Sequence, residues 1–600
     1  MTATHETPAI DERTGDQPDG VESRPSAAER RRWSRVDVYA LLLYCAGAFY
    51  VTFRGWLDVK SVFLGSRPGD VSFNEWMISY QAHAVTHLDN PFFTTMQNAP
   101  DGVNLVANVG MQAPGILLSP LTLTAGPQYT YILVMTLNLA ATAFAWYWVF
   151  SRHLVASRGA ALVGGLFCGF APGLLSQSNG HPHITAQYLV PFIVLQVIRL
   201  AEPGRTVRRG LILAALVAAQ FYLGLEVLLL VAVGCAIAAV TYVLMRPRAA
   251  IKALPSALGS LAITAGTVLI LVAFPLWMMY FGPQSRGGHP GEADVYALTL
   301  KSFVDWPTLS FLGGPGSTRD SVANATEEAA YFGWPVLVLA LAAIGWLWRR
   351  AVGVRVLAFV ALVPGALAIG TTWAWTRADR GDVPAPFAFV EHLPPFDAIV
   401  VARFALITTA ALGILLAVAA DHVARLRSLP VRVTVSVLMA AALLPIVPTP
   451  LVANRRADIP AFITSGAWRE YVADERTLVP VPVDNLRSIR WGSAGGAGFA
   501  VPQGYFLGPT SATDKTGRWG VEPRPTAALL TAVASGKRPP EVTTAEEVQA
   551  VADARFWRAD AFVLDPLQDS APLLEALRGL YGPGQLVDGV WVWDVRPLTN

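Results

Sequence analysis

The sequence predicts an α-helical polytopic membrane protein with about eleven transmembrane helices, followed by a C-terminal α/β domain. Three observations support this fold class. The 600-residue chain is 53% hydrophobic and only 15% charged, whereas soluble proteins carry about 25% charged residues. Its mean hydropathy is +0.43. Apolar runs near the roughly 20 residues that a membrane-spanning helix needs recur between residues 36 and 452.

Charge and cysteine usage exclude other classes of protein. The formal net charge is only +2, so the chain lacks the basic excess of a nucleic-acid-binding protein. The three cysteines, Cys45, Cys168 and Cys235, lie within apolar runs, where cysteine behaves as a small hydrophobic residue. Their spacing matches neither a disulfide framework nor a metal site.

The first segment, residues 1–35, is polar and rich in Pro, Asp, Glu and Arg. It lacks apolar periodicity, which predicts a disordered cytoplasmic N-terminus. It ends with four arginines, Arg30, Arg31, Arg32 and Arg35. No small-residue cleavage site follows them, and the positive-inside rule places this cluster in the cytoplasm.

Transmembrane helices are predicted at 36–53, 128–150, 159–178, 184–200, 210–224, 226–245, 254–277, 331–348, 355–375, 401–420 and 431–452. The run 210–245 is too long for one crossing and short for two, and Gly224 offers a break. The arginine-rich connections lie at 152–158, 205–209, 246–252, 349–355 and 425–432. They all share the side of the N-terminus only if 210–245 is a hairpin, which favours the hairpin over a single tilted helix.

The opposite side of the membrane then receives most of the polar chain. It carries the long outer loops 54–127, 278–330 and 376–400 and the C-terminal segment 453–600. Bulk on one face and short basic turns on the other indicate an enzyme or receptor that works outside the cytoplasm. No internal sequence repeat supports the inverted-repeat architecture of many transporters.

The C-terminal segment has the pattern of an extracytoplasmic α/β domain. Strands are expected at 477–483, 498–506, 561–564 and 589–595, and helices at 525–535, 544–558 and 571–581. Thr544 is the expected N-cap of the middle helix, before Glu546 and Glu547. The glycine-rich stretch 492–498 lacks the GxGxxG frame and a following helix, so dinucleotide binding is rejected.

The loop after the first helix carries an acid well placed for chemistry at a membrane surface. Asp70 follows a Pro68–Gly69 turn. Aromatic residues from Val71 onward recur at helical spacing, which predicts an interfacial helix lying along the outer surface. A carboxylate leading into it can act as a general base, removing a proton from an acceptor hydroxyl as a phosphate leaves. The alternative is a turn or N-cap aspartate.

Glu75, five residues after Asp70, can assist Asp70 or face solvent. Two carboxylates at this spacing could share a divalent metal ion, but the spacing is not a metal motif, so no metal ligands and no certain cofactor are assigned. His181 and His183, in the loop QSNGHPH (177–183), are predicted on the same side. They can bind a phosphate or orient a leaving group, although an H-x-H pair without a third ligand defines no metal site. The alternative is a polar loop with satisfied imidazoles.

Two charged residues near helix ends complete the predicted site. Glu226 stands in an apolar run, where a carboxylate is costly and therefore suggests function. It can bind substrate or simply lie near water at the tip of a hairpin. Arg403 begins the 401–420 helix, and its guanidinium can bind a lipid-linked phosphate through paired donors. The alternative is a snorkelling interfacial arginine.

Together these features resemble an actinobacterial multi-pass protein of the GT-C class of glycosyltransferases. The resemblance rests on the arginine-rich start, the GD-aromatic loop ending in APDGVNL, the SNGHPH loop, the YFGWP start of helix 331–348 and the α/β tail. GT-C enzymes use polyprenyl-phosphate sugars and carry an acidic catalytic residue in the first outer loop. The resemblance implies Asp70 as that acid, although no D-x-D or E-x-D motif stands beside it. It places His181, His183 and Arg403 near the donor phosphate.

The resulting hypothesis is a multi-pass cell-membrane glycosyltransferase that moves a sugar from a polyprenyl-phosphate donor to a glycan or lipid acceptor of the cell envelope. Asp70 would activate the acceptor hydroxyl. The substrate-binding residues would be Glu75, His181, His183, Glu226 and Arg403. The alternatives are a transporter or flippase of a lipid-linked glycan, and a non-catalytic envelope-assembly protein. The spans are mostly Ala, Leu and Val, with Glu226 the main exception, which favours the enzyme over the transporter.

Overall fold

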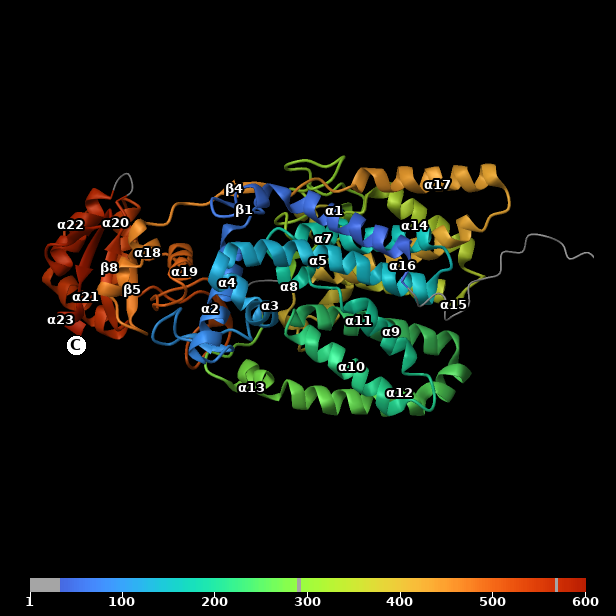
Figure 1. Cartoon of the computed structure of the whole chain (residues 1–600), viewed down its shortest axis with the longest axis horizontal. Coiled ribbons are helices and arrows are strands. Elements are labelled where there is room, and N and C mark those ends of the chain that lie inside the picture. Colours follow the sequence, from blue (N-terminus) through green and yellow to red (C-terminus); the bar gives the residue numbers. More distant parts are fainter. Residues whose placement is uncertain (1–32, 289–292, 567–569, 600) are drawn as a thin grey trace, which may run out of the picture.

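The computed structural model describes residues 33–288, 293–566 and 570–599. Within these ranges, seven helices are long and apolar enough to cross a membrane (Figure 1): Arg35–Leu57, Pro127–Leu154, Arg158–Gln177, Leu225–Met245, Pro247–Leu271, Val401–Ala424 and Leu429–Ile446. The prediction of a helical membrane protein is therefore confirmed. Of the N-terminal segment predicted to be disordered, residues 1–32 lie outside the described residues, and helix α1 begins at Arg35.

Every predicted crossing overlaps a helix, but the helices differ in length. The bundle helices are α1 (Arg35–Leu57), α5 (Pro127–Val149), α6 (Arg158–Phe170), α7 (Pro172–Gln177), α9 (Val190–Arg199), α10 (Thr206–Phe221), α11 (Leu225–Met245), α12 (Pro247–Leu271), α14 (Gly333–Leu347), α15 (Val352–Leu367), α16 (Ala405–Ala424) and α17 (Leu429–Leu443). Helices α9, α14 and α15 are apolar but shorter than the seven long spans. The run 210–245 is divided into α10 and α11 at Tyr222–Gly224, the break that the hairpin interpretation requires.

Small residues allow close packing in the middle of the bundle, as is common between membrane helices. A Cβ added to Gly169 of α6 would lie 2.3 Å from the Cβ and 2.7 Å from the Cα of Ala143 in α5. A Cβ on Gly413 of α16 would lie 2.2 Å from the sulfur of Cys168. Helix α6 is therefore held directly against both α5 and α16.

Helix α2 (Pro68–His87) corrects the prediction of an interfacial helix. Nearly every residue from Val71 to Ala84 is buried, and Trp76 is fully enclosed. One side of α2 packs on α19 (Asn485–Ala494) of the C-terminal segment, and the other on α3 (Gln112–Leu117), α4 (Ser119–Ala125) and α5. The aromatic residues that predicted contact with lipid headgroups instead fill the layer between the bundle and the C-terminal segment.

Short elements complete this layer. Strand β1 (Val62–Leu64), just after α1, pairs antiparallel with β4 (Ala453–Arg455), just after α17. Other short elements are β2 (Phe93–Thr94), β3 (Val103–Asn104), α8 (Pro182–Thr185) and α13 (Ala273–Phe281). The β1–β4 pair joins the two ends of the bundle sequence where the chain enters its C-terminal segment.

The C-terminal segment contains a four-stranded sheet in the order β5-β8-β10-β9. The strands are β5 (Thr477–Val481), β8 (Ala559–Leu564), β10 (Val590–Asp594) and β9 (Gln585–Val587). β5 and β8 are parallel, while β10 is antiparallel to both of its neighbours. All six residues of β8 are buried. Alternate residues of a strand point to opposite faces, so Phe562 and Leu564 pack in one apolar cluster and Ala561 and Val563 in another.

Helices α20 (Pro525–Ala534), α21 (Thr544–Phe556) and α22 (Ala571–Tyr581) lie near their predicted positions. Two local predictions are wrong. The N-cap of α21 is Thr543, which forms a capping box with Glu546, rather than Thr544. Residues 498–506 form no strand and make only one isolated bridge, Thr477–Ala500. The following residues form a short hairpin instead, β6 (Leu507–Pro509) and β7 (Gly517–Trp519).

Replacing Gly169 by alanine is expected to destabilise the bundle, because the added Cβ meets the backbone of Ala143. Overpacking of this kind typically costs about 1–3 kcal/mol. Gly266 in α12 is the matched control, since a Cβ there meets no described atom within 4 Å and alanine is the better helix former. Thermal unfolding of both variants in one detergent measures the difference. Equal stability of Gly169→Ala and Gly266→Ala would contradict close α5–α6 packing.

Candidate functional site

Asp70 lies in the first turn of α2. Pro68 takes the first helical position, which suits its fixed backbone angle. Gly69 admits the ring of Tyr505, since a Cβ there would lie 2.6 Å from that ring. The Tyr505 hydroxyl donates to Asp70 Oδ1 at 2.8 Å. The Pro-Gly-Asp sequence therefore brings a carboxylate against a tyrosine 435 positions later in the chain.

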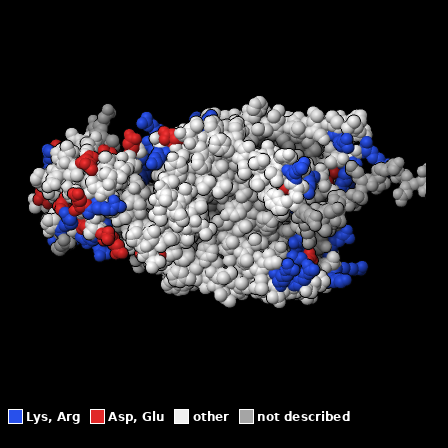
Figure 2. Space-filling model, viewed as in Figure 1, with Lys and Arg blue, Asp and Glu red and all other residues white. Residues whose placement is uncertain are grey.

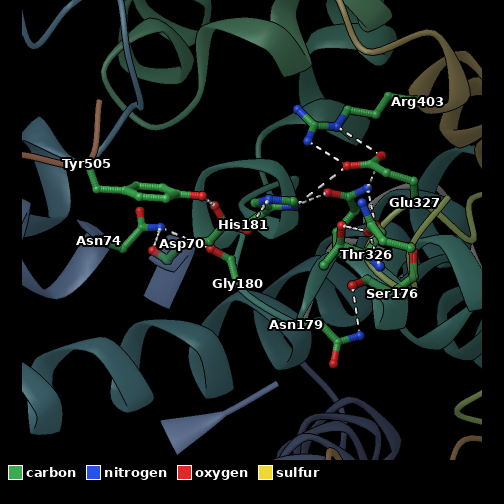
Figure 3. Close-up of polar contacts among 12 residues, drawn as sticks. Asp70, Asn74, Ser176, Asn179, Gly180, His181, Thr326, Glu327, Arg403 and Tyr505 are labelled. Atoms are coloured by element: carbon green, nitrogen blue, oxygen red, sulfur yellow. Dashed lines mark hydrogen bonds and ion pairs between the residues drawn. The ribbon is translucent and has the colours of Figure 1, made fainter. Parts of the chain in front are cut away.

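The turn between α7 and α8 brings His181 to the same carboxylate. Gly180 has a φ of +146°, and its added Cβ would lie 3.0 Å from the Cβ of Asp70, so both backbone angle and space favour glycine. The Asn74 amide donates to the carbonyls of Asp70 and Gly180 at 2.8 and 2.9 Å. As a result, His181 Nε2 lies 3.6 Å from Asp70 Oδ2 (Figure 3).

Hydrogen bonds on the other side of the His181 ring fix its tautomer. Gln177 Nε2 donates to the Thr326 carbonyl at 2.8 Å and to Glu327 Oε2 at 3.0 Å. Gln177 Oε1 therefore accepts from His181 Nδ1, at 2.7 Å. With its proton on Nδ1, a neutral His181 presents only a lone pair to Asp70. A shared proton, or a hydroxyl group lying between the two residues, makes this contact favourable.

Glu327 connects the histidine turn to the starts of two bundle helices. Arg403, in the 3-10 turn η8 (Val401–Phe404), donates from Nη2 to Glu327 Oε1 at 2.7 Å and from Nε to Oε2 at 3.2 Å. Its Nη1 donates to Oε2 of Glu226, in the first turn of α11, at 2.6 Å. We call Asp70, Gln177, His181, Glu226, Glu327, Arg403 and Tyr505 the Asp70–Arg403 network.

Electrostatic effects keep Asp70 ionised. Burial is the largest influence and opposes its charge, but the hydrogen bond and positive charge that His181 supplies when protonated act against burial, helped by Tyr505 and Arg67. The sum lowers the pKa of Asp70 below its ordinary value of 3.8. Burial and the charge of Asp70 raise the pKa of Tyr505, so the phenol remains a hydrogen-bond donor. The Asp70 side chain is 20% exposed and is therefore within reach of another molecule.

One protein-family model matches the part of the chain that contains most of this site. The model of a family described as "Domain of unknown function (DUF6311)" matches residues 40–447. The protein belongs to the DUF6311 family. The matched region contains every member of the Asp70–Arg403 network except Tyr505, which lies in the C-terminal segment. No curated protein matches the chain.

Three solved structures of the Archaeoglobus fulgidus oligosaccharyltransferase are distantly similar, each over 91% of this DUF6311 protein. The apo form is 12% identical over 71% of its own chain, with a TM-score of 0.46. The complex with an inhibitory peptide and a dolichol-phosphate is 11% identical over 71%, with a TM-score of 0.48. The complex with zinc and sulfate is 11% identical over 70%, with a TM-score of 0.46. TM-scores below 0.5 assign neither an activity nor a substrate.

Of the six site residues predicted from the sequence, four lie in the network and two lie outside it. The structure brings Asp70, His181, Glu226 and Arg403 into one network. Glu226 and Glu327 accept hydrogen bonds from the Arg403 guanidinium, and the residue is only 8% exposed. The role of Arg403 as a phosphate-binding residue stays a prediction. In this DUF6311 protein the Arg403 guanidinium orients the carboxylates of Glu226 and Glu327.

His183 lies beside the network, with its ring centroid 5.7 Å from that of His181. Burial first, and then the charges of His181 and Arg403, lower the pKa of His183 well below 6.5. The ring is therefore neutral at physiological pH, and its Nδ1 has no hydrogen-bond partner within the described part of the chain. A neutral His183 can offer a hydrogen bond but no positive charge to a phosphate, and its substrate-binding role stays a prediction.

Glu75 belongs to a different contact. It is buried and accepts from Arg456 Nη1 at 2.7 Å and from Arg456 Nη2. Arg456 follows β4, and its Nε donates to the Val62 carbonyl at 2.8 Å. Burial raises the pKa of Glu75 even though Arg456 opposes that effect. This pair joins α2 to the strand that leads into the C-terminal segment. Glu75 is therefore not part of the Asp70–Arg403 network, and its substrate-binding role stays a prediction.

Three network residues were missed as site residues. Gln177 stands in the loop already singled out as QSNGHPH, but its amide gave no chemical signal. Glu327 is half of the acidic pair Glu327–Glu328 just before the YFGWP motif, which is a usable signal. Tyr505 has no local signal, because its contact with Asp70 depends on how the C-terminal segment folds. In the described ranges, no group of three or more His, Cys, Asp or Glu side chains is arranged to hold a metal ion.

Proposed function

We propose that this DUF6311 protein is a GT-C-like membrane glycosyltransferase, which transfers a sugar from a polyprenyl-phosphate donor to a hydroxyl group of a cell-envelope acceptor. The observation that carries the proposal is the state of Asp70. Asp70 is the acid that the resemblance to GT-C glycosyltransferases implies. Its lowered pKa keeps it ionised, and its side chain is 20% exposed. It lies beside an oriented histidine at the end of an apolar helical bundle.

In the proposed reaction, Asp70 is the general base. It takes the proton of the acceptor hydroxyl while the acceptor oxygen forms a bond to the anomeric carbon of the donor sugar. The bond between that carbon and the phosphate oxygen breaks, and the polyprenyl phosphate leaves with the electron pair. The 3.6 Å gap between Asp70 Oδ2 and His181 Nε2 suits a hydroxyl group that approaches both residues.

The remaining network residues act as positioning groups. Glu327 accepts from Gln177 and so fixes the amide that orients His181. Arg403 holds Glu327 in place through two hydrogen bonds, a geometry that is both strong and directional. Arg67, which is exposed and close enough to Asp70 to lower its pKa, is the proposed partner of the donor phosphate.

The distribution of charge supports a site outside the cytoplasm. Figure 2 shows Lys and Arg gathered at the end of the bundle away from the C-terminal segment, with an uncharged belt between. The positive-inside rule assigns such a basic end to the cytoplasm. The N-terminus is then cytoplasmic, and the C-terminal segment, as an extracytoplasmic α/β domain, packs over Asp70 through Tyr505.

Replacing Asp70 by asparagine is expected to reduce sugar transfer by at least about a hundredfold, the lower end of what general-base catalysis supplies. The measurement uses the full-length protein in liposomes with a radiolabelled polyprenyl-phosphate sugar and an envelope glycan extract. Asp101→Asn, in the same loop but exposed, is the matched control and should keep wild-type transfer. Wild-type transfer by a folded Asp70→Asn variant would remove Asp70 from the mechanism. Movement of labelled lipid across the bilayer without a new bond would favour the flippase.

Replacing His181 by asparagine is expected to move the acidic limb of the pH–rate profile to higher pH. Burial and His181 act on the pKa of Asp70 in opposite directions, so loss of His181 lets burial raise it. Activity requires ionised Asp70 and is lost as pH falls through that pKa. A shift of roughly 1–3 units is the usual scale for losing a nearby opposite charge.

The control for this profile is His87→Asn, at the exposed end of α2, which should leave the acidic limb in place. The expected result separates a charge effect from a folding effect, because a variant with damaged structure loses activity at every pH. An acidic limb that is unchanged in His181→Asn, with activity still measurable, would contradict the coupling of His181 to Asp70.

A further inference from the structure

A cavity of about 500 Å³ lies between the loops 278–330 and 376–400. Small-molecule sites typically have volumes of about 300–1,000 Å³. The lining of the cavity includes Asp294, Tyr296, Glu391, Phe396, Asp397 and Val400. None of these residues belongs to the Asp70–Arg403 network.

The lining combines carboxylates with aromatic rings. Asp294 is held in place, since Oδ1 accepts from the Thr371 amide at 2.7 Å and Oδ2 from the Thr371 hydroxyl at 2.5 Å. Arg380 Nη1 lies 3.6 Å from the same carboxylate. Glu391 is partly buried and Asp397 is exposed. His392, also in the lining, has its Nε2 3.5 Å from Glu391 Oε1. Three carboxylates beside one guanidinium and one imidazole give the cavity an acidic character.

The aromatic side of the cavity lies against the turn that carries Arg403. Phe396 is partly exposed, and its ring stacks on Phe404 with centroids 5.9 Å apart and an interplanar angle of 21°. Phe387, also in the lining, packs on the same ring at 6.0 Å. Phe404 directly follows Arg403 in η8. The floor of the cavity therefore rests on the turn that carries the network arginine.

Two observations connect the surroundings of the cavity with the C-terminal segment, which also carries Tyr505. Tyr296, on the lining, is near enough to Tyr505 to add to the effects of burial and Asp70 on the pKa of that phenol. At the rim, Gly287 exchanges backbone hydrogen bonds with the C-terminal segment, donating to the Lys515 carbonyl at 2.8 Å and accepting from the Gly517 amide at 3.1 Å. The C-terminal segment thus reaches both Asp70 and the rim of the cavity.

We propose that this cavity, the Asp294–Asp397 pocket, binds a neutral, unphosphorylated sugar unit of the acceptor glycan. Sugar hydroxyls donate hydrogen bonds to carboxylates, and the apolar face of a sugar ring packs on an aromatic ring such as that of Phe396. The same carboxylates repel phosphate groups, which keeps the anionic lipid-linked donor out of this pocket. The assignment of the sugar to the acceptor rests on the proposed glycosyltransferase function.

The test measures binding separately from catalysis. Full-length protein in nanodiscs is mixed with neutral hexose and pentose oligosaccharides and, in parallel, with the same glycans carrying a terminal phosphate, and binding is followed by saturation-transfer NMR and titration. Asp397→Lys reverses one exposed charge of the pocket and is expected to weaken neutral-glycan binding about tenfold or more. Phe396→Ala should weaken it as well. Asp382→Lys, an equally exposed residue of the same loop that does not line the pocket, is the matched control.

The Asp70→Asn variant separates this proposal from the proposed function. It should bind the neutral glycan like the wild type while losing transfer. Glycan binding by a wild type that transfers no sugar would overturn the proposed function and leave the pocket standing. The pocket proposal fails if no neutral glycan binds, if phosphorylated glycans bind more tightly, or if Asp397→Lys and Phe396→Ala bind like Asp382→Lys.

Discussion

The ion pairs of Arg403 with Glu226 and Glu327 are the constraint on which the rest of the site depends. Charged groups buried beside an apolar bundle are costly unless each satisfies the others. Here the Arg403 guanidinium donates two hydrogen bonds to Glu327 and one to Glu226. Glu327 uses the same carboxylate to hold the turn that carries His181. Charge balance at the starts of α11 and α16 therefore fixes the position of Glu327. Through Gln177, Glu327 then orients His181 beside Asp70.

A second constraint is the layer formed by α2. Its N-terminal turn meets Tyr505, and its middle carries Glu75, which binds Arg456 at the start of the C-terminal segment. Both contacts join residues more than 380 positions apart in the chain. The C-terminal segment therefore contributes a residue to the site, Tyr505. The same segment also contacts Gly287, at the edge of the Asp294–Asp397 pocket.

The sequence predicted the helices well because membrane crossings depend on local composition, as the correspondence of 36–53 with α1 illustrates. It also predicted that Asp70, His181, Glu226 and Arg403 would lie on one side of the membrane, and the structure joins them. It failed where a pattern depends on distant partners. The aromatic pattern of α2 suits an interface as well as a core, and only the fold supplies the α19 surface that buries Trp76. Tyr505 was beyond local patterns for the same reason, whereas Glu327 had a local signal in the acidic pair Glu327–Glu328, although its partners Gln177 and Arg403 are distant in the chain.

The most direct test of this account is an experimental structure of the full-length protein in lipid nanodiscs, at a resolution that shows side chains. The account predicts the Glu327 carboxylate between Arg403 and Gln177, the His181 ring facing Asp70, and the Tyr505 hydroxyl on the Asp70 carboxylate. A structure in which Glu327 turns away and Arg403 is free, or in which Asp70 and His181 lie far apart, would contradict it.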